Sequence, residues 1–183
     1  MILPIVKYGD PVLRQRGATV GKVTPELRQL ARDMLDTMRK AEGVGLAAQQ
    51  VGRALQLAVI DIPADSKRKS RLWLDGKEAD VQSIMPLTLI NPHIEITKKK
   101  ELDNEGCLSF PGINIDLNRG FRVKVRYQDL DLQPREFEAG GLLGRAVQHE
   151  FDHLHGVLFI DKLSAAEREQ LKDKLAGLRA QPR

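Results

Sequence analysis

The sequence predicts an α+β fold, in which antiparallel or mixed β-sheets pack around a central helix and a further helix lies at the C-terminus. Apolar residues recur at helical spacing over residues 25–41 and 142–154. Residues 121–127 instead alternate apolar and basic side chains, as a half-buried antiparallel strand does. The predicted strands and helices do not alternate regularly, which argues against a parallel βαβ architecture.

The composition is that of an ordinary folded domain. The chain has 183 residues, of which 42% are hydrophobic and 30% charged, so we expect one domain over residues 1–183 and no extensive disorder. It contains no apolar run long enough for a membrane span, and the N-terminus reaches Lys7 too early for a signal peptide. A single cysteine excludes an intramolecular disulfide and fits a reducing, cytoplasmic location.

The first predicted helix begins at Pro25, a residue that suits the first helical position. Thr24 is placed to cap it. The glycines at positions 43 and 45 end the helical pattern.

Several predicted strands follow the first helix. Their ranges are 55–60, 87–91, 93–97, 121–127 and 135–138. Pro92 is expected to break or kink the second and third of these. Residues 64–83 are polar and rich in lysine and arginine, which favours a surface excursion. At the other end of the chain, Ser164 and Glu167 form a capping box for a last helix over about 164–178.

The most informative motif is His-Glu-Phe-Asp-His at residues 149–153, on the predicted central helix. Its histidines are four residues apart, so both rings lie on one side of the helix and can bind one metal ion. Glu150 lies beside them, where it can reach a water molecule near that ion. The alternative is a surface helix with two solvated histidines. Against it, His149 and His153 continue the apolar stripe of Leu142 and Ala146, which should face the core.

A third ligand would decide the class of enzyme. The metzincin pattern fails because Phe159 occupies the position of its third histidine. A thermolysin-like site would use a downstream glutamate such as Glu167 or Glu169. The remaining candidate is Cys107. A single cysteine is most often a small buried hydrophobic residue with no role in metal binding. The glycine neighbour and compact motif of Cys107 favour thiolate ligation.

Three segments together resemble the motifs of peptide deformylases. They are Gly-Val-Gly-Leu-Ala-Ala-Gln-Gln at residues 43–50, Glu-Gly-Cys-Leu-Ser at 105–109 and Gln-His-Glu-Phe-Asp-His-Leu at 148–154. Residues 9–14 also resemble the family's N-terminal segment, and the resemblance extends from about residue 3 to residue 163.

The resemblance implies a metal site formed by Cys107, His149 and His153. It implies one divalent ion, natively Fe2+ in many members, with Zn2+, Ni2+ or Co2+ able to substitute. Glu150 would act as general base and acid on a metal-activated water.

The resemblance also implies an oxyanion hole formed by the side chain of Gln50 and the backbone N–H of Leu108. The substrate would be the N-terminal formyl-methionine of a nascent polypeptide, hydrolysed to formate and a free amine.

Five further residues are expected to contact the substrate. Leu142 and Ala146 precede the histidines on their helical stripe and should form one wall of an apolar methionine pocket, with Val44 opposite. Gly45 allows the main chain to approach a peptide closely and pair with it as a strand does, and Gly106 should lie nearby.

The sequence departs from the family pattern at a few positions. Asn114 stands where many bacterial members carry an arginine, and Arg119 lies five residues further on. Arg145 lies between the pocket-facing residues, off their stripe, so we expect its side chain to point away from the pocket. These departures bear on peptide selectivity and leave the chemistry intact.

Two other functions, a zinc endopeptidase and an RNA-binding or ribosome-binding protein, would require different metal ligands. A zinc endopeptidase would use a downstream glutamate and would not need Cys107. An RNA-binding or ribosome-binding protein is suggested by the net charge of +4 and the pI near 9.3, but a structural metal would need a fourth protein ligand. We expect no membrane partner and no sequence-specific nucleic acid, while the basic balance permits association with the ribosome.

Overall fold

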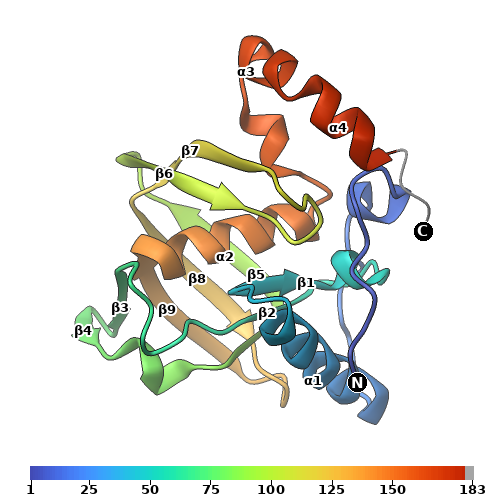
Figure 1. Ribbon diagram of the computed structural model, residues 1–183. Helices are drawn as coiled ribbons and strands as arrows, with labels where there is room; N and C mark the ends of the chain where they lie inside the picture. The colour runs from blue at the N-terminus through green and yellow to red at the C-terminus, as the bar shows by residue number, and fades with distance from the viewer. Residues whose placement is uncertain (180–183) are drawn as a thin grey trace.

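The computed structural model describes residues 1–179 and has the predicted α+β architecture (Figure 1). Its 3-10 helices (η), α-helices (α) and strands (β) are, in chain order, η1 (Pro11–Arg14), α1 (Pro25–Lys40), β1 (Gly45–Ala47), η2 (Ala48–Val51), β2 (Leu57–Ile60), β3 (Ser70–Leu74), β4 (Lys77–Ala79), η3 (Val81–Ile84), β5 (Leu87–Ile96), β6 (Lys100–Gly106), β7 (Asn114–Gly120), β8 (Arg122–Gln128), β9 (Pro134–Gly140), α2 (Gly141–Leu154), η4 (Phe159–Lys162), α3 (Ala165–Gln170) and α4 (Lys172–Arg179).

Within these residues the strands form one large sheet and one two-stranded ribbon. The large sheet has the order β1-β2-β5-β8-β9-β3-β4, and β6 pairs with β7 in the ribbon. The strand pairs of residues 1–179 are antiparallel, as the α+β prediction requires. None of the helices in this part of the chain combines the length and apolar character needed to cross a lipid bilayer.

Helix α2 is the centre of the fold. It lies between the β6–β7 ribbon and the large sheet, so nearly every side chain on it is buried (Figure 1). Gly141 starts the helix with a φ of 60°, and a Cβ there would lie 2.2 Å from the carbonyl oxygen of Lys69. A glycine is therefore required for α2 to begin against the start of β3.

Helix α1 forms as the sequence predicted. The Thr24 side chain accepts a hydrogen bond from the N–H of Leu27 at 3.2 Å, which caps the helix. Its apolar face packs on β1 and β2, where Met34 and Met38 are fully buried. This packing fixes the start of the segment that follows α1.

Residues 64–83 contain more regular secondary structure than the surface excursion that the sequence predicts. They contain the β3–β4 hairpin, and β3 pairs with β9 in the large sheet. Leu72 is fully buried in that sheet. The apolar run at residues 72–74 decides the structure here, although lysines and arginines surround it.

Two predicted elements have different boundaries in the structure. The two strands expected around Pro92 are one strand, β5, whose register shifts between Ile90 and His93. Asn91 makes the bulge with a φ of 49°, and its side chain bonds both backbone polar groups of Val20. The last helix has the predicted Ser164 capping box but divides at Leu171 into α3 and α4.

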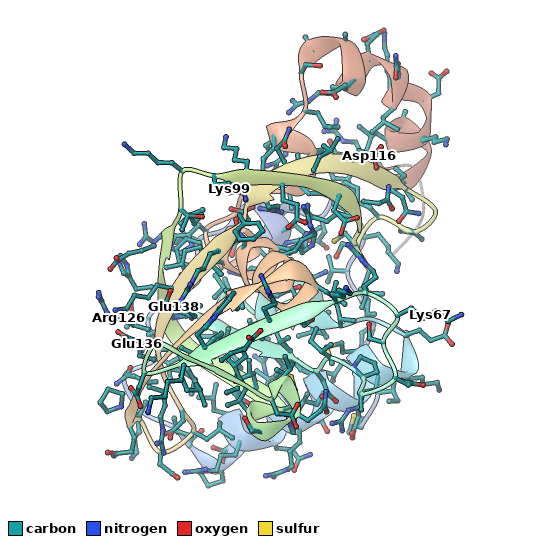
Figure 2. The ribbon with its side chains drawn as sticks, turned by 90° about the vertical axis from the view of Figure 1, so that its left-hand side faces the viewer. Lys67, Lys99, Asp116, Arg126, Glu136 and Glu138 are labelled. Atoms are coloured by element: carbon teal, nitrogen blue, oxygen red, sulfur yellow. The ribbon has the colours of Figure 1, made fainter. Side chains whose placement is uncertain are left out.

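The outer face of β8 and β9 carries cross-strand ion pairs (Figure 2). Arg122 pairs with Glu138 at 2.6 Å, and both Lys124 and Arg126 pair with Glu136 at 2.9 Å. Exposed pairs of this kind contribute little individually, but opposite charges across the strands favour this register. The basic positions predicted in residues 121–127 are therefore the solvent face of the sheet.

Candidate active site

Three polar side chains of α2 lie where an amphipathic helix would carry apolar ones. His149, Glu150 and His153 have exposed fractions of 7%, 3% and 1%. The two rings are one helical turn apart, with their centroids 4.9 Å from each other. Both histidines are therefore buried on one face of the central helix, and the alternative of solvated surface histidines is excluded.

Cys107 reaches this face from the turn that follows β6. Its Sγ lies 3.3 Å from Nε2 of His153. Within residues 1–179, the sulfur and one ring nitrogen of each histidine lie within 4.8 Å of one another and form the cluster of ligand atoms suited to a metal. Glu167, which an endopeptidase would use, instead completes the capping box of α3.

The donor set fits one divalent ion of the transition series. A thiolate and two imidazoles suit Zn2+ or Fe2+, and donors that share a tetrahedral ion lie about 3.5 Å apart. His149 uses Nδ1 to bond Glu105, which leaves its Nε2 for a metal. Among the described residues, one carboxylate oxygen of Glu150 is buried with no protein partner. Such an atom is costly unless a ligand or water bonds it.

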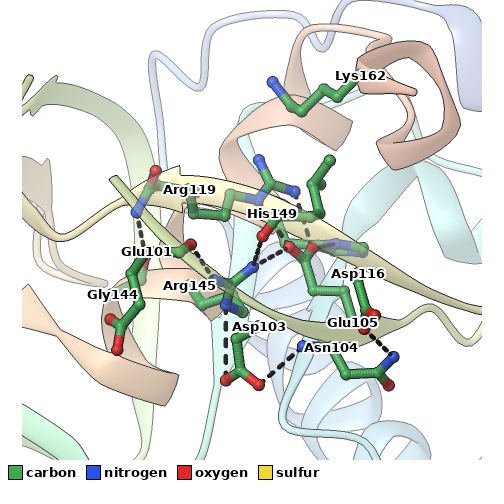
Figure 3. A network of polar contacts seen from close by, with 12 residues as sticks. Glu101, Asp103, Asn104, Glu105, Asp116, Arg119, Gly144, Arg145, His149 and Lys162 are labelled. Carbon is green, nitrogen blue, oxygen red and sulfur yellow. Dashed lines mark hydrogen bonds and ion pairs between the residues drawn. The ribbon is translucent and has the colours of Figure 1, made fainter. Parts of the chain in front are cut away.

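Glu105 holds His149 in place from the last part of β6 (Figure 3). Its carboxylate accepts a hydrogen bond from Nδ1 of His149 at 2.7 Å. Arg119 binds both of its oxygens, at 2.8 and 2.9 Å, and Arg145 binds one at 2.9 Å. Burial alone would raise the pKa of Glu105, but the hydrogen bonds from Arg119 and His149 lower it far below its usual range. Glu105 is thus a fixed anion that orients the imidazole.

The two arginines of this network also bind other parts of the fold. Arg119 is 5% exposed and also pairs with Asp152 on α2. The Arg145 guanidinium bonds the backbone oxygens of Glu101 and Leu117 in addition to Glu105. This guanidinium group thus lies toward the β6–β7 ribbon, but Arg145 also lines the cavity beside the metal ligands, so the expectation that it would point away from the pocket holds only for its charged end. No sequence motif predicts this network, because its members meet only through the packing of the ribbon on α2.

Glu150 points at the first glycine-bounded segment. A Cβ on Gly45 would lie 2.4 Å from Oε1 of Glu150, so the carboxylate packs directly on the main chain of β1. Burial raises the pKa of Glu150 to about 7, against the nearby charge of His149, which lowers it. A carboxyl group with this pKa can both accept and return a proton near neutral pH.

A cavity of about 650 Å³ opens beside His149 and Glu150. The five residues expected to contact substrate all line it, and they are Val44, Gly45, Gly106, Leu142 and Ala146. Asn114 also lines it, close to Gly106. The cavity therefore has an apolar part formed by Leu142 and Ala146 of α2, and it is bounded by main chain at β1 and after β6.

Gln50 and Leu108 lie on the same side of the cavity. The Nε2 atom of Gln50 is 3.5 Å from the Cys107 sulfur and 3.2 Å from Oγ of Ser109. Its Oε1 accepts a hydrogen bond from the N–H of Ala47 at 2.9 Å, which fixes the amide with its NH2 group toward the cysteine. Leu108 follows the cysteine directly and lines the cavity.

Sequence reasoning missed two other parts of the cavity wall. The N-terminal segment contributes Ile5 and Lys7, and the excursion before β3 contributes Arg68. Neither segment carries a motif, and both reach the site only through the tertiary fold.

The comparisons with known proteins agree with this geometry. A family model described as polypeptide deformylase matches residues 2–169. The peptide deformylase of Methylacidiphilum infernorum is 52% identical over 179 residues, covering 98% of this chain and 94% of its own. That of Opitutus terrae is 46% identical over 92% of this chain and 88% of its own. The crystal structure of the Thermotoga maritima peptide deformylase superposes with a TM-score of 0.76 at 39% identity, covering 90% of this chain and 99% of its own.

Proposed function

The chain belongs to the peptide deformylase family and is a hydrolase with peptide deformylase activity, and from this premise we propose which of its residues perform the reaction. The observation that carries the proposal is the convergence of Cys107, His149 and His153, with Glu150 beside them. The reaction is hydrolysis of the N-terminal formyl group of a formyl-methionyl nascent polypeptide, which releases formate.

Cys107, His149 and His153 would hold the metal. A divalent cation bound there would supply a nucleophilic water at neutral pH. Glu105 supports this role, because its hydrogen bond to Nδ1 of His149 holds the ring with Nε2 toward the other two ligands.

Glu150 moves the proton. Its carboxylate takes a proton from the attacking water and then returns it to the nitrogen of the leaving amine. A pKa raised to about 7 by burial supports both steps, because neither protonation state is strongly disfavoured at neutral pH.

Gln50 and Leu108 stabilise the charge that develops on the formyl oxygen. The Gln50 amide is held by its bond from Ala47, so its N–H groups need no reorganisation during the reaction. The backbone N–H of Leu108 is the second donor.

The methionine side chain binds against Leu142 and Ala146, with Val44 opposite. Burial of such a side chain is worth about 1.5–3 kcal/mol, and the small Ala146 leaves depth for it. The following peptide lies along β1, where Gly45 and the glycine next to Cys107 allow close approach of the main chain.

We propose Fe2+ as the native metal, with Zn2+, Ni2+ or Co2+ as substitutes. A site with one thiolate and an open position exposes both Fe2+ and the sulfur to oxidation by dioxygen. The iron form should therefore lose activity in air, while a nickel form persists. Equal lifetimes of the two forms would contradict iron as the native ion.

The broader setting follows from the reaction. The protein would act as one domain over residues 1–183 in the cytoplasm, on nascent chains as they leave the ribosome. Its excess of positive charge supports a weak ribosome association, and we propose no sequence-specific nucleic-acid partner.

The decisive experiment measures formate release from a formyl-Met tripeptide together with metal content. Cys107→Ala should lose tightly bound metal and nearly all activity. Glu150→Gln should retain the metal and lose kcat by at least about a hundredfold, because the base is missing. Glu169→Gln is the matched control, since Glu169 is an exposed glutamate on α3 that an endopeptidase would use as ligand.

Each variant can contradict the assignment. Full metal occupancy and turnover in Cys107→Ala would exclude the three-ligand scheme. A wild-type rate in Glu150→Gln would exclude its acid–base role, and metal loss in Glu169→Gln would favour the endopeptidase arrangement.

A further inference from the structure

Residues 6–8, which we call the N-terminal strap, connect the two segments that carry the proposed oxyanion donors. The N–H of Val6 donates to the carbonyl oxygen of Gln50 at 2.8 Å. Nζ of Lys7 donates to the carbonyl oxygen of Leu108 at 3.0 Å, and the N–H of Tyr8 donates to that of Ser109 at 2.9 Å. The strap thus joins η2 to the loop after Cys107, and it runs alongside η2 in Figure 1.

The loop after β6 is held at three successive carbonyl groups. The oxygen of Cys107 accepts from the N–H of Phe110 at 2.8 Å, and those of Leu108 and Ser109 accept from the strap. Because each peptide unit is planar, fixing its carbonyl oxygen also fixes the direction of the N–H in the same unit. The bond from Phe110 to the Cys107 carbonyl therefore sets the direction of the Leu108 N–H. The bond from Lys7 to the Leu108 carbonyl fixes the next peptide unit and so limits rotation about the Cα of Leu108.

Among the three hydrogen bonds of the strap, the one from Lys7 to Leu108 is made by a side chain. The other two strap bonds use backbone N–H groups, which any residue except proline provides. Lys7 is half-buried and lines the cavity, and its ammonium group also adds a positive charge beside the loop where negative charge develops in the reaction.

Packing holds the strap where Lys7 can act. The Tyr8 ring is 8% exposed and stacks on Phe110 with centroids 4.8 Å apart. Arg179 also packs on the Tyr8 ring, with its guanidinium carbon 4.8 Å from the ring centroid. The strap is therefore anchored to the loop that it bonds.

We propose that Lys7 is a positioning residue for the oxyanion hole, acting through the carbonyl group of Leu108. This inference rests on the proposed roles of Gln50 and Leu108. It predicts that Lys7 contributes to the transition state and very little to binding of the substrate in its ground state.

The test compares Lys7→Met and Lys7→Arg with the wild type in the metal-loaded enzyme. Lys7→Met keeps the length of the side chain and removes the donor and charge, while Lys7→Arg keeps both. We expect kcat of Lys7→Met for a formyl-Met tripeptide to fall about tenfold with KM changed less than about twofold, and Lys7→Arg to restore most of the loss. Lys67→Met is the matched control, because Lys67 is exposed near the same cavity and points away from the protein (Figure 2).

A second measurement does not depend on turnover. Hydrogen exchange of the amides at residues 107–110 should be faster in Lys7→Met than in the wild type and unchanged in Lys67→Met, because the loop loses one of its bonds. If Lys7→Met binds less metal, Lys7→Leu, which also lacks the donor and the charge, replaces it and is judged by the same criteria.

An unchanged kcat in Lys7→Met would overturn the proposal. So would a raised KM at constant kcat, which would place Lys7 in contact with the substrate, or a loss of kcat that Lys7→Arg does not repair. Failure of the proposed function is distinguished separately, because formate release by the wild type and its loss in Gln50→Ala do not depend on Lys7.

Discussion

Replacement of Gly45 by alanine should inactivate the enzyme by displacing Glu150. The added Cβ would lie 2.4 Å from Oε1, 2.9 Å from Cδ and 3.0 Å from Cγ of Glu150. Ordinary contact begins at 3.4 Å, so the carboxylate must move by 3.4 − 2.4 = 1.0 Å. Glu150 is 3% exposed on a buried helix and lines the cavity, so the cavity is the space into which its carboxylate would be displaced.

A displacement of this size is large for a proton-transfer group. Misplacement by about 1 Å costs on the order of a hundredfold in rate, and overpacking a buried site costs about 1–3 kcal/mol of stability. We therefore expect Gly45→Ala to fold and to bind its metal, with a slightly lower melting temperature and kcat reduced about a hundredfold.

The assay is formate release at saturating and subsaturating formyl-Met peptide, with metal analysis and thermal unfolding on the same samples. Gly21→Ala is the control, because a Cβ on Gly21 meets nothing within 4 Å. A Gly45→Ala enzyme with wild-type kcat would refute the argument, since it would show that the position of the Glu150 carboxylate does not limit the reaction.

Three further predictions follow from the described contacts. Ala146→Phe should fill the side-chain pocket and raise KM for formyl-Met peptides more than about tenfold with metal still bound; an unchanged KM would exclude this pocket. Glu105→Gln should remove the buried carboxylate that Arg119 and Arg145 share and lower the free energy of unfolding by about 3–5 kcal/mol in chemical denaturation, whereas a loss below about 1 kcal/mol would contradict the network. Burial raises the pKa of Asp161, but the hydrogen bonds from Arg14 and the N–H of Leu158 lower it by more, so the net shift is downward. The ionised Asp161 therefore stabilises the fold at pH values above the pKa of the unfolded state. Asp161→Asn should therefore destabilise the protein at pH 7, and the difference from wild type should shrink as the pH falls below about 4; a difference that grows in acid would refute the sign.

The sequence predicted the parts of the fold that depend on local side-chain pattern. Helices α1 and α2 carry clear apolar faces with recognisable ends, and β8 alternates cleanly, so all three were found. Strand β6 was missed because its residues are mostly polar and exposed, and its pairing with β7 uses backbone bonds that leave no pattern in the sequence.

The same distinction applies to the site. The metal donors and Glu150 belong to compact motifs, and the structure brings them together. The links of Glu105 to Arg119 and Arg145, and of Lys7 to Leu108, join residues from 14 to 101 positions apart. Such contacts are products of tertiary packing, and a single sequence contains no local signal for them.

The location of β1 has a consequence for the behaviour of the protein at high concentration. β1 ends the large sheet, and unpaired strand edges invite other chains to add to them and aggregate. Here the unpaired edge borders the cavity, whose opposite wall comes from the excursion before β3 and the turn after β6. This edge therefore lies inside the cavity and not on an open face of the molecule. At the other end of the sheet, β4 is three residues long and carries Lys77 and Glu78, so charge and brevity protect that edge. The enzyme can thus offer a strand edge to unfolded chain ends without offering it to its own folded copies.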